Sequence, residues 1–414
     1  MEPLTSNEKK GLNILVVCQY YYPEPFRVAD MCEELVRRGH NVMVLTGIPN
    51  YPEGIIYDGY RNRKKRQEII NGVKVRRCFT VGRRKGVFFR LLNYYSYAVS
   101  STLAVYFNRC KPDNGKEYDV ILVNQLSPVM MAYAGIAYKK KKHKKLVLYC
   151  MDLWPESLIG GGIRRGSKIF RIFYRISERI YKNCDKILVT SRSFIDYFNK
   201  EFSIEKDKMA YLPQYAETLF SKMESPMEKK ENYDFVFAGN IGEFLGVQTI
   251  IEAAELLKEN KEIRFHIVGS GTHLEYCKKI TKDKGLKNII FYGRKPVEEM
   301  GKYYSMADAM LVTLSADPVI SLTLPGKVQS YMAAGKPILG AIDGETQRVV
   351  REARCGYVGP ADNAGELADN IEKFIKLSDE EKRQFGCRAR EYYEKNFAKE
   401  VYMSQMEYWL NQYT

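Results

Sequence analysis

Residues 324–337, LPGKVQSYMAAGKP, combine the signals of a helix start and a helix end with a basic side chain between them. Pro325 is typical of a helix start and Gly335 of a helix end, so the pattern predicts a short helix. Lys327 then lies in the first turn, where a positive charge opposes the helix dipole. A bound diphosphate would explain a lysine there, and we predict that Lys327 binds one. Three polar side chains of this helix are expected to reach a ribose or a base: Gln329, Ser330 and Tyr331.

Two glycine turns follow predicted strands earlier in the same half of the chain. They are GNIG at 239–242 and GSG at 269–271, and each precedes a helical pattern. Glycine lets the backbone approach a ligand closely, and the amides of a helix N-terminus attract phosphate. An ordinary tight strand–helix connection explains one such turn equally well. Two turns at successive strand ends favour a binding site, because ligands of open α/β sheets bind at the carboxyl ends of strands.

A polar and aromatic cluster, DLWPE at 152–156, follows a predicted strand in the first half of the chain. Asp152, Trp154 and Glu156 are residue types suited to sugar recognition, and Asp152 is a candidate catalytic residue. The alternative is structural, with Trp154 in the core and Asp152 capping a helix. The sequence leaves both interpretations open. Arg27 and Gln125 occupy equivalent loops after other predicted strands.

Apolar runs of strand length alternate with helical patterns along the whole chain. In the first half, strands are expected at 13–19, 41–46, 120–124, 146–150 and 186–190, with helices that include 28–38 and 167–183. In the second half, strands at 233–238, 264–268, 289–292 and 309–313 alternate with helices at 247–260, 272–284 and 297–307. Two consecutive sets of this kind predict an α/β protein with two doubly wound, Rossmann-like domains.

The expected join between the domains is a polar segment with two prolines and a charge run, at 213–232. The prediction is therefore a first domain at 1–212, this linker, and a second domain at 233–390. A last helical stretch is expected at 379–410, with residues 391–414 packing back on the first domain.

The net charge of +15 is concentrated in the first half of the chain. Residues 1–230 hold 41 Lys and Arg against 23 Asp and Glu, whereas residues 231–414 hold 24 against 27. Basic runs at 61–66, 83–90, 139–145 and 164–179 alternate with aromatic residues. A solvated charged face explains any single run, but several together favour an anionic membrane surface. The aromatic residues expected to insert there are Phe88, Phe89, Phe170 and Phe173. Nucleic acid is the competing partner, and since no module that binds it is recognised, we expect none.

The nine cysteines are scattered and form no CxxC pair, which predicts buried, reduced thiols rather than disulfides or zinc. The four histidines have no ligand spacing, so we expect no metal and no cofactor. A signal-peptide pattern and a run of 18 uncharged apolar residues are both absent from the sequence. A cytoplasmic protein is therefore expected.

Eight short segments carry a resemblance to a known family. They are YYPE at 21–24, RGHNVMVLT at 38–46, IPNYP at 48–52, NQLSP at 124–128, DLWP at 152–155, AGN at 238–240, VGSG at 268–271 and the block at 327–337. Together they resemble retaining GT-B glycosyltransferases of family 4. The similarity extends over nearly the whole chain and is strongest to bacterial transferases of O-antigen, capsule and colanic-acid assembly, including an N-acetylfucosamine transferase subgroup.

The resemblance implies a GT-B fold with a cleft between two domains, transfer with retention, and no metal. It implies a nucleotide-sugar donor, expected to be a UDP-sugar, and a polyprenyl-diphosphate-linked acceptor at the inner face of the plasma membrane. The donor would be bound by the second domain through Gly239, Asn240, Gly242, Gly271, Arg294, Lys327, Gln329 and Ser330. The acceptor would face Asp152 in the first domain, together with Arg27, Gln125, Trp154 and Glu156.

Several positions depart from the family pattern. The usual pair of glutamates is replaced by Leu322 and Ser330, and the usual Arg and Lys after the first strand of the second domain by Asn240 and Leu245. These changes leave Lys327 with more of the charge that faces the diphosphate. Two rival functions follow from the same resemblance: a GT-B sugar-nucleotide epimerase, and an inactive protein that binds nucleotide sugar within a polysaccharide assembly complex.

Overall fold

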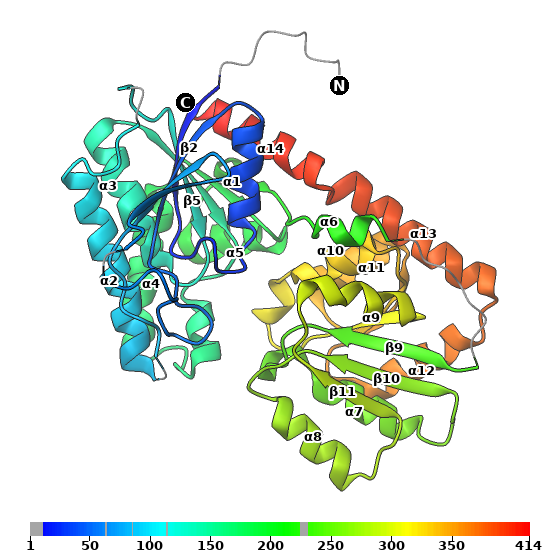
Figure 1. The fold of residues 1–414 in the computed structure, drawn as a ribbon. Helices are drawn as coiled ribbons and strands as arrows, with labels where there is room; N and C mark the ends of the chain where they lie inside the picture. Colours follow the sequence, from blue (N-terminus) through cyan, green and yellow to red (C-terminus); the bar gives the residue numbers. More distant parts are fainter. Residues whose placement is uncertain (1–10, 63, 85, 113–114, 224–230) are drawn as a thin grey trace, which may run out of the picture. The chain divides into compact units, whose positions relative to one another are not determined.

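The computed structural model describes residues 11–62, 64–84, 86–112, 115–223 and 231–414 (Figure 1). They form two compact units. The first contains described residues up to 190 together with 195–212 and 403–414, and the second contains 191–194 and 213–402. Arg63 and Lys85 of the basic runs, and residues 224–230 of the expected linker, lie outside the described residues.

Eight strands of the first unit form one sheet in the order β3-β4-β2-β1-β5-β6-β7-β8. Neighbouring strands are parallel except for β3 and β4, which pair antiparallel. The strands are β1 Asn13–Val17, β2 Asn41–Thr46, β3 Gln67–Ile70, β4 Val73–Arg77, β5 Val120–Gln125, β6 Lys145–Cys150, β7 Lys186–Val189 and β8 Met209–Tyr211. The strand order reverses between β1 and β5, so the loops after these strands are where a doubly wound sheet binds ligands.

Helices cover this sheet and connect its parallel strands. They are α1 Val28–Arg37, α2 Val87–Tyr106, α3 Tyr133–Lys142, α4 Lys168–Asn183 and α5 Ser193–Phe202. The end of the last helix, α14 (Lys399–Gln412), also belongs to this unit. Glu407 in α14 accepts a hydrogen bond from Arg38 at 2.8 Å, and its carboxylate lies 2.9 Å from His40 Nε2. The last residues of the chain are therefore fixed to the first unit by buried polar contacts.

The second unit contains a six-stranded, fully parallel sheet in the order β11-β10-β9-β12-β13-β14. Its strands are β9 Tyr233–Ala238, β10 Ile263–Val268, β11 Ile289–Gly293, β12 Ala309–Thr313, β13 Ile338–Ala341 and β14 Gly356–Gly359. Its helices are α6 Thr218–Ser221, α7 Val247–Leu256, α8 Leu274–Asp283, α9 Met300–Met306, α10 Gly326–Ala333, α11 Gly344–Ala353, α12 Ala364–Ile375 and α13 Asp379–Asn396. Here the strand order reverses between β9 and β12.

The strands at the centre of both sheets are buried on both faces. Every residue of β1, β5 and β12 is buried, which explains why these strands read as continuous apolar runs. In the second unit a core of aromatic and branched side chains joins β9 and β10 to α7 and α12. The prediction of two doubly wound α/β domains is confirmed.

Two local expectations differ from the structure. The stretch 379–410 forms two helices, α13 and α14, with a break at Phe397 and Ala398, because Phe397 leaves helical geometry and its side chain is buried. The antiparallel hairpin of β3 and β4 was not expected. Asn71 and Gly72, both at positive φ, form its turn, and an Asn-Gly pair is a known hairpin signal.

The nine cysteines are free thiols, and eight of them are buried, with Cys387 exposed. This agrees with the expected buried thiols. Among the described residues, no helix is long and apolar enough to cross a membrane.

The expected membrane-inserting residues are only partly at the surface. Phe88 is 68% exposed, but Phe170 and Phe173 in α4 are only 6% and 5% exposed. The prediction for Phe170 and Phe173 is therefore wrong, because these rings face the core while Ile169 and Ile172 of the same helix face outward.

Candidate functional site

Lys327 is the second residue of α10 and directs its side chain inward, against the end of β9. Its Nζ lies 3.7 Å from the centre of the Phe237 ring, and a Cβ placed on Gly239 would lie 3.1 Å from it. The amine is buried and has no hydrogen-bond partner among the described residues. Burial lowers the pKa of Lys327 from 10.5 to about 7. The expected first-turn position is correct, and the structure adds that the amine of Lys327 is buried.

Tyr331 holds α10 in this position. Its hydroxyl donates to the Ala238 carbonyl at 2.8 Å and accepts from the Ala238 amide at 2.9 Å. Lys327 lies one turn earlier on the same face of the helix, so this attachment places its amine beside Phe237 and Gly239. The expectation that Tyr331 reaches a ligand is wrong, because its hydroxyl is fully buried against β9.

The two glycine turns lie against each other at the ends of β9 and β10. The Gly239 amide donates to the Val268 carbonyl at 2.9 Å, and the Ile241 amide donates to the Ser270 carbonyl at 2.9 Å. A Cβ on Gly269 would lie 1.8 Å from the Gly239 carbonyl oxygen, and one on Gly271 would lie 2.2 Å from the Ile241 carbonyl oxygen. The close approach of two loops therefore requires these glycines, whether or not a ligand is bound.

The structure brings together, in these loops, four of the residues predicted to bind the nucleotide-sugar donor: Gly239, Asn240, Gly242 and Gly271. Asn240 is exposed, and its side-chain oxygen lies 2.7 Å from the position of a Cβ on Gly271. Gly239 has φ +147°, and Lys327 fills the space in front of it, so both the backbone and the packing favour glycine there. The loops therefore lie next to the buried Lys327 amine at the end of β9.

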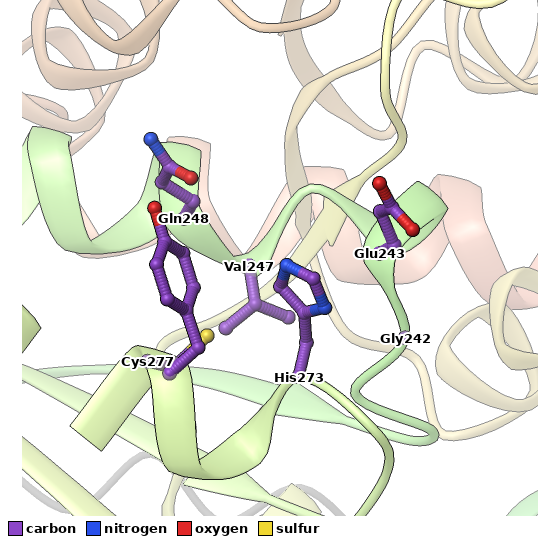
Figure 2. Close-up of a pocket in the computed structure, with 7 residues that line it drawn as sticks. Gly242, Glu243, Val247, Gln248, His273 and Cys277 are labelled. Carbon is purple, nitrogen blue, oxygen red and sulfur yellow. The ribbon is translucent and has the colours of Figure 1, made fainter. Parts of the chain in front are cut away.

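A cavity of about 300 Å³ adjoins the same loop, between the first turns of α7 and α8 (Figure 2). Gly242 and Glu243 line it from the first loop, and His273 lines it from the second. The His273 ring packs on the edge of Tyr276, with 5.1 Å between ring centres. Sequence reasoning missed this cavity. The signals nearest to it in the sequence were Gly242 and the GSG turn at 269–271, which ends two residues before His273.

The three remaining residues predicted to bind the nucleotide-sugar donor have different environments. Arg294 is exposed directly after β11, beyond Gly293 at φ +68°. Gln329 is fully buried, and its amide nitrogen, oriented toward carbonyl groups, donates to Pro325 O at 2.8 Å. Ser330 is buried, and its hydroxyl lies 3.2 Å from both the Glu217 carboxylate and Gly326 O, to one of which it donates. The expected contacts of Gln329 and Ser330 with a ribose are therefore corrected, because both groups are used within the protein.

Asp152 lies after β6 in the first unit and is partly exposed. Its two carboxylate oxygens accept hydrogen bonds from the hydroxyls of Ser127 and Ser157. Burial raises the pKa of Asp152, and these hydrogen bonds oppose the rise. Asp152 is thus an oriented carboxylate rather than a cap of an α-helix. Ser127 and Ser157 were not predicted, although Ser127 lies within the NQLSP segment.

Gln125 and Trp154 adjoin Asp152. The Gln125 amide donates to the Asp152 carbonyl at 2.9 Å, which joins the loops after β5 and β6. Trp154 is 1% exposed, packs edge-on against Tyr94 and Phe173, and donates from Nε1 to Ser127 at 2.8 Å. Of the two interpretations of Trp154, the structure favours the core residue.

Glu156 lies differently from what was expected, whereas Arg27 lies before α1, as the sequence predicted. Glu156 is buried, and its carboxylate accepts from Arg165 and from the Tyr197 hydroxyl, the latter at 2.8 Å. The prediction that Glu156 contacts an acceptor is corrected, because a buried carboxylate with two partners serves packing. Arg27 is the partly exposed N-cap residue of α1.

Models of known protein families match the sequences of both units. A model of Glycosyltransferase Family 4 matches residues 26–214, and a model of Glycosyl transferases group 1 matches residues 221–392. The chain is 28% identical over 244 residues to "Probable glycosyltransferase WbjE" of Pseudomonas aeruginosa, covering 56% of this chain and 60% of that protein. It is 27% identical over 353 residues to "Putative colanic acid biosynthesis glycosyl transferase WcaI" of Escherichia coli, covering 78% and 82%.

The chain belongs to the GT-B glycosyltransferases of group 1/family 4. Its fold matches that of HepE from Anabaena, solved in complex with UDP, with a TM-score of 0.70, 14% identity and coverage of 97% of this chain and 100% of that one. At this identity the match to HepE shows the fold alone.

This glycosyltransferase has no group of three or more His, Cys, Asp or Glu side chains arranged to bind a metal, within the part of the chain that the structure describes. Glycosyltransferases of this family use nucleotide sugars as substrates. In the second unit, the Lys327 amine is buried against the Phe237 ring and has no hydrogen-bond partner among the described residues.

Proposed function

We propose that this glycosyltransferase transfers a sugar from a UDP-sugar, with retention, to a lipid-linked glycan during cell-surface polysaccharide synthesis. The buried amine of Lys327, beside the glycine loop at the end of β9, is the observation that carries the proposal. The names of WbjE and WcaI support a role in glycosyl transfer, and the name of WcaI also supports polysaccharide synthesis. The UDP complex of HepE supports the choice of nucleotide.

The donor site consists of Lys327, the loops at Gly239–Gly242 and Gly271, and the exposed Arg294. A diphosphate beside Lys327 would give its amine the hydrogen-bond acceptor that it lacks. The negative charge would also raise the pKa of Lys327 above 7, so that the lysine becomes a cation when the donor binds. That cation would stabilise the charge on the departing nucleotide diphosphate. The phosphate itself then accepts the proton of the acceptor hydroxyl.

The acceptor site is proposed at Asp152, with Arg27 in a neighbouring loop and with the buried Gln125 at the end of β5 positioning the Asp152 backbone. Ser127 and Ser157 fix the direction of the Asp152 carboxylate, which suits an oriented hydrogen bond to a sugar hydroxyl. Trp154 would position this loop rather than contact the sugar, because its ring is buried.

A lipid-linked acceptor would place the protein on the inner face of the plasma membrane as a cytoplasmic, peripheral enzyme. The positive excess of residues 1–230 supports this location, since each Lys or Arg near an anionic surface contributes about 1 kcal/mol.

The test compares two buried lysines of the second unit. Lys327→Met should weaken UDP binding by roughly 1.5–3 kcal/mol, the range for a hydrogen bond to a charged group, as measured by calorimetry. Lys336→Met is the matched control, because Lys336 is also buried but donates to the carbonyls of Ser305 and Ala307. Equal UDP affinity in the wild type and Lys327→Met would refute the proposed donor site.

Activity assays separate this proposal from its rivals. Incubation with UDP-sugars and a lipid-linked acceptor should release UDP and give a longer glycan. Conversion of one UDP-sugar into its epimer without transfer would indicate an epimerase. Binding of UDP without either reaction would indicate an inactive scaffold protein.

A further inference from the structure

Helix α2 exposes an apolar stripe to solvent along its whole length. The exposed side chains recur at intervals of three and four residues, so they share one face of the helix. They are Phe88, Leu92, Tyr95, Val99, Leu103 and Tyr106. An apolar face of this periodicity normally packs in a core, and one left exposed marks an interaction surface.

An apolar groove of about 450 Å³ lies between this stripe and α3. Tyr95, Val99 and Leu103 line it from α2, while Tyr133 and Ile136 line it from α3. The two helices are neighbours in the first unit (Figure 1). Thr102 adds its methyl group, because its hydroxyl donates to the Ala98 carbonyl of its own helix at 2.7 Å. The groove is thus lined by hydrocarbon over most of its surface.

Basic side chains flank the groove, and neither α2 nor α3 contains an acidic residue. Lys140 lines one end, is exposed, and makes no ion pair within the described part of the chain. Arg179 of α4 is exposed near Tyr133. Burial raises the pKa of Tyr133, and the charge of Arg179 opposes this rise. The surface therefore combines a hydrocarbon slot with cations at its edge.

Neighbouring lysines of the same basic run are already engaged. Lys139 pairs with Asp185 at 2.6 Å, and Lys142 pairs with Glu117 at 2.7 Å. Lys141 donates to the Tyr106 carbonyl at 2.6 Å, at the end of α2. Lys140 is consequently the member of Lys139–Lys142 whose charge is available to an anionic partner.

We infer that the groove between α2 and α3 receives a hydrocarbon chain of an anionic membrane phospholipid, with the lipid phosphate near Lys140. This rests on, and deepens, the proposed attachment to a membrane surface. It assigns that attachment to the stripe of α2, in place of the Phe170 and Phe173 rings that the sequence suggested. A lipid is favoured over a protein partner because the positive excess of this half of the chain complements an anionic bilayer.

Fluorescence quenching by lipid bromine atoms tests the assignment directly in the full-length protein. Val99→Trp places a reporter at a groove position that is 56% exposed, and Ile69→Trp places one on β3 at a position that is 70% exposed. Vesicles of phosphatidylglycerol with brominated chains should quench the emission added by the Val99→Trp reporter and leave that of Ile69→Trp unchanged. Equal quenching of both, or quenching of neither on vesicle-bound protein, would overturn the assignment. An emission shift of Val99→Trp that depends on protein concentration without vesicles would indicate self-association instead, and would also overturn it.

Sedimentation with vesicles provides the matched loss of function. Val99→Gln combined with Leu103→Gln should reduce partitioning onto phosphatidylglycerol vesicles about tenfold, because two exposed apolar side chains lose their contact with hydrocarbon. Ile69→Gln should sediment like the wild type, and equal sedimentation of all three proteins would contradict the inference. UDP affinity measured on the same samples distinguishes failure of the groove assignment from failure of the proposed donor site. Intact UDP binding with unchanged sedimentation refutes only the groove, whereas lost UDP binding in the wild type refutes only the donor site.

Discussion

Lys327 lies in the first turn of α10 and Lys336 follows the end of this helix. The Lys327 amine and the Lys336 side chain are both buried, but their surroundings differ. The Lys336 amine donates to the carbonyls of Ser305 and Ala307, at the end of α9, where the negative end of the helix dipole favours a cation. The Lys327 amine lies near the start of α10, where the dipole is unfavourable, and it has no hydrogen-bond partner among the described residues. A buried cation needs hydrogen-bond partners to offset the cost of its burial, and a buried cation without them lowers the stability of the fold.

The same distinction applies to two carboxylates of the first unit. Glu156 is buried in an ion pair with Arg165 and a hydrogen bond with Tyr197. Asp152 is held by two hydroxyls, forms no ion pair with the described residues, and is partly exposed. We therefore assign Glu156 to the fold and Asp152 to the proposed acceptor site.

The largest effect on stability is expected for Lys336→Met. The substitution leaves two carbonyl oxygens without their donor, and each lost partner costs about 1–3 kcal/mol. Chemical denaturation should show this loss, while calorimetry should show unchanged UDP affinity. If Lys336→Met were as stable as the wild type, the proposed difference between the two lysines would be contradicted.

Lys327→Met should have the opposite effect and make the protein more stable. The pKa of Lys327 is lowered to about 7 in the folded protein. Below pH 7 the folded state therefore contains a buried ammonium that has no hydrogen-bond partner among the described residues. Wild-type stability should rise with pH between about 7 and 10.5, because the unfolded lysine still binds the proton there. The gain from Met should hence be largest below pH 7 and fade toward pH 10.5. Thermal denaturation at several pH values would reveal this gain in stability as a rise in melting temperature of roughly 2–4 °C for each kcal/mol. A loss of stability at pH 6 would contradict this account.

Glu156→Gln and Asp152→Asn should separate fold from function in the first unit. Glu156→Gln weakens a buried charge pair, and we expect a stability loss on the order of 1–3 kcal/mol with glycosyl transfer retained. Asp152→Asn keeps the size of the side chain and should reduce transfer with little change in the melting temperature. Assays of glycosyl transfer and of unfolding on both variants would show which carboxylate serves the fold and which serves the acceptor site. The reverse assignment would follow if Glu156→Gln abolished transfer in a fully stable protein.

The sequence predicted the elements well because strands buried on both faces read as apolar runs and α10 has clear start and stop residues. The direction of individual side chains depends on tertiary contacts. Lys327 turns inward because Tyr331 is attached to Ala238, a contact between residues far apart in the chain. In α4, apolar residues occur on two faces, so the pattern could not show that Phe170 is buried and Ile169 exposed. Gln329 and Ser330 were chosen by position in the helix, which does not reveal that their polar groups are already used.

Calorimetric titration of UDP at pH 8, in two buffers with different ionisation enthalpies, tests the role of Lys327 most directly. At this pH the terminal phosphate is already ionised, so its own protonation contributes little. A diphosphate that pairs with Lys327 must raise the pKa of the amine, and binding should therefore take up close to one proton in the wild type. The uptake should be absent in Lys327→Met and unchanged in Lys336→Met, and wild-type affinity should fall as the pH rises above 7. Binding of UDP to the wild type without proton uptake, or with the same uptake in Lys327→Met, would contradict the account.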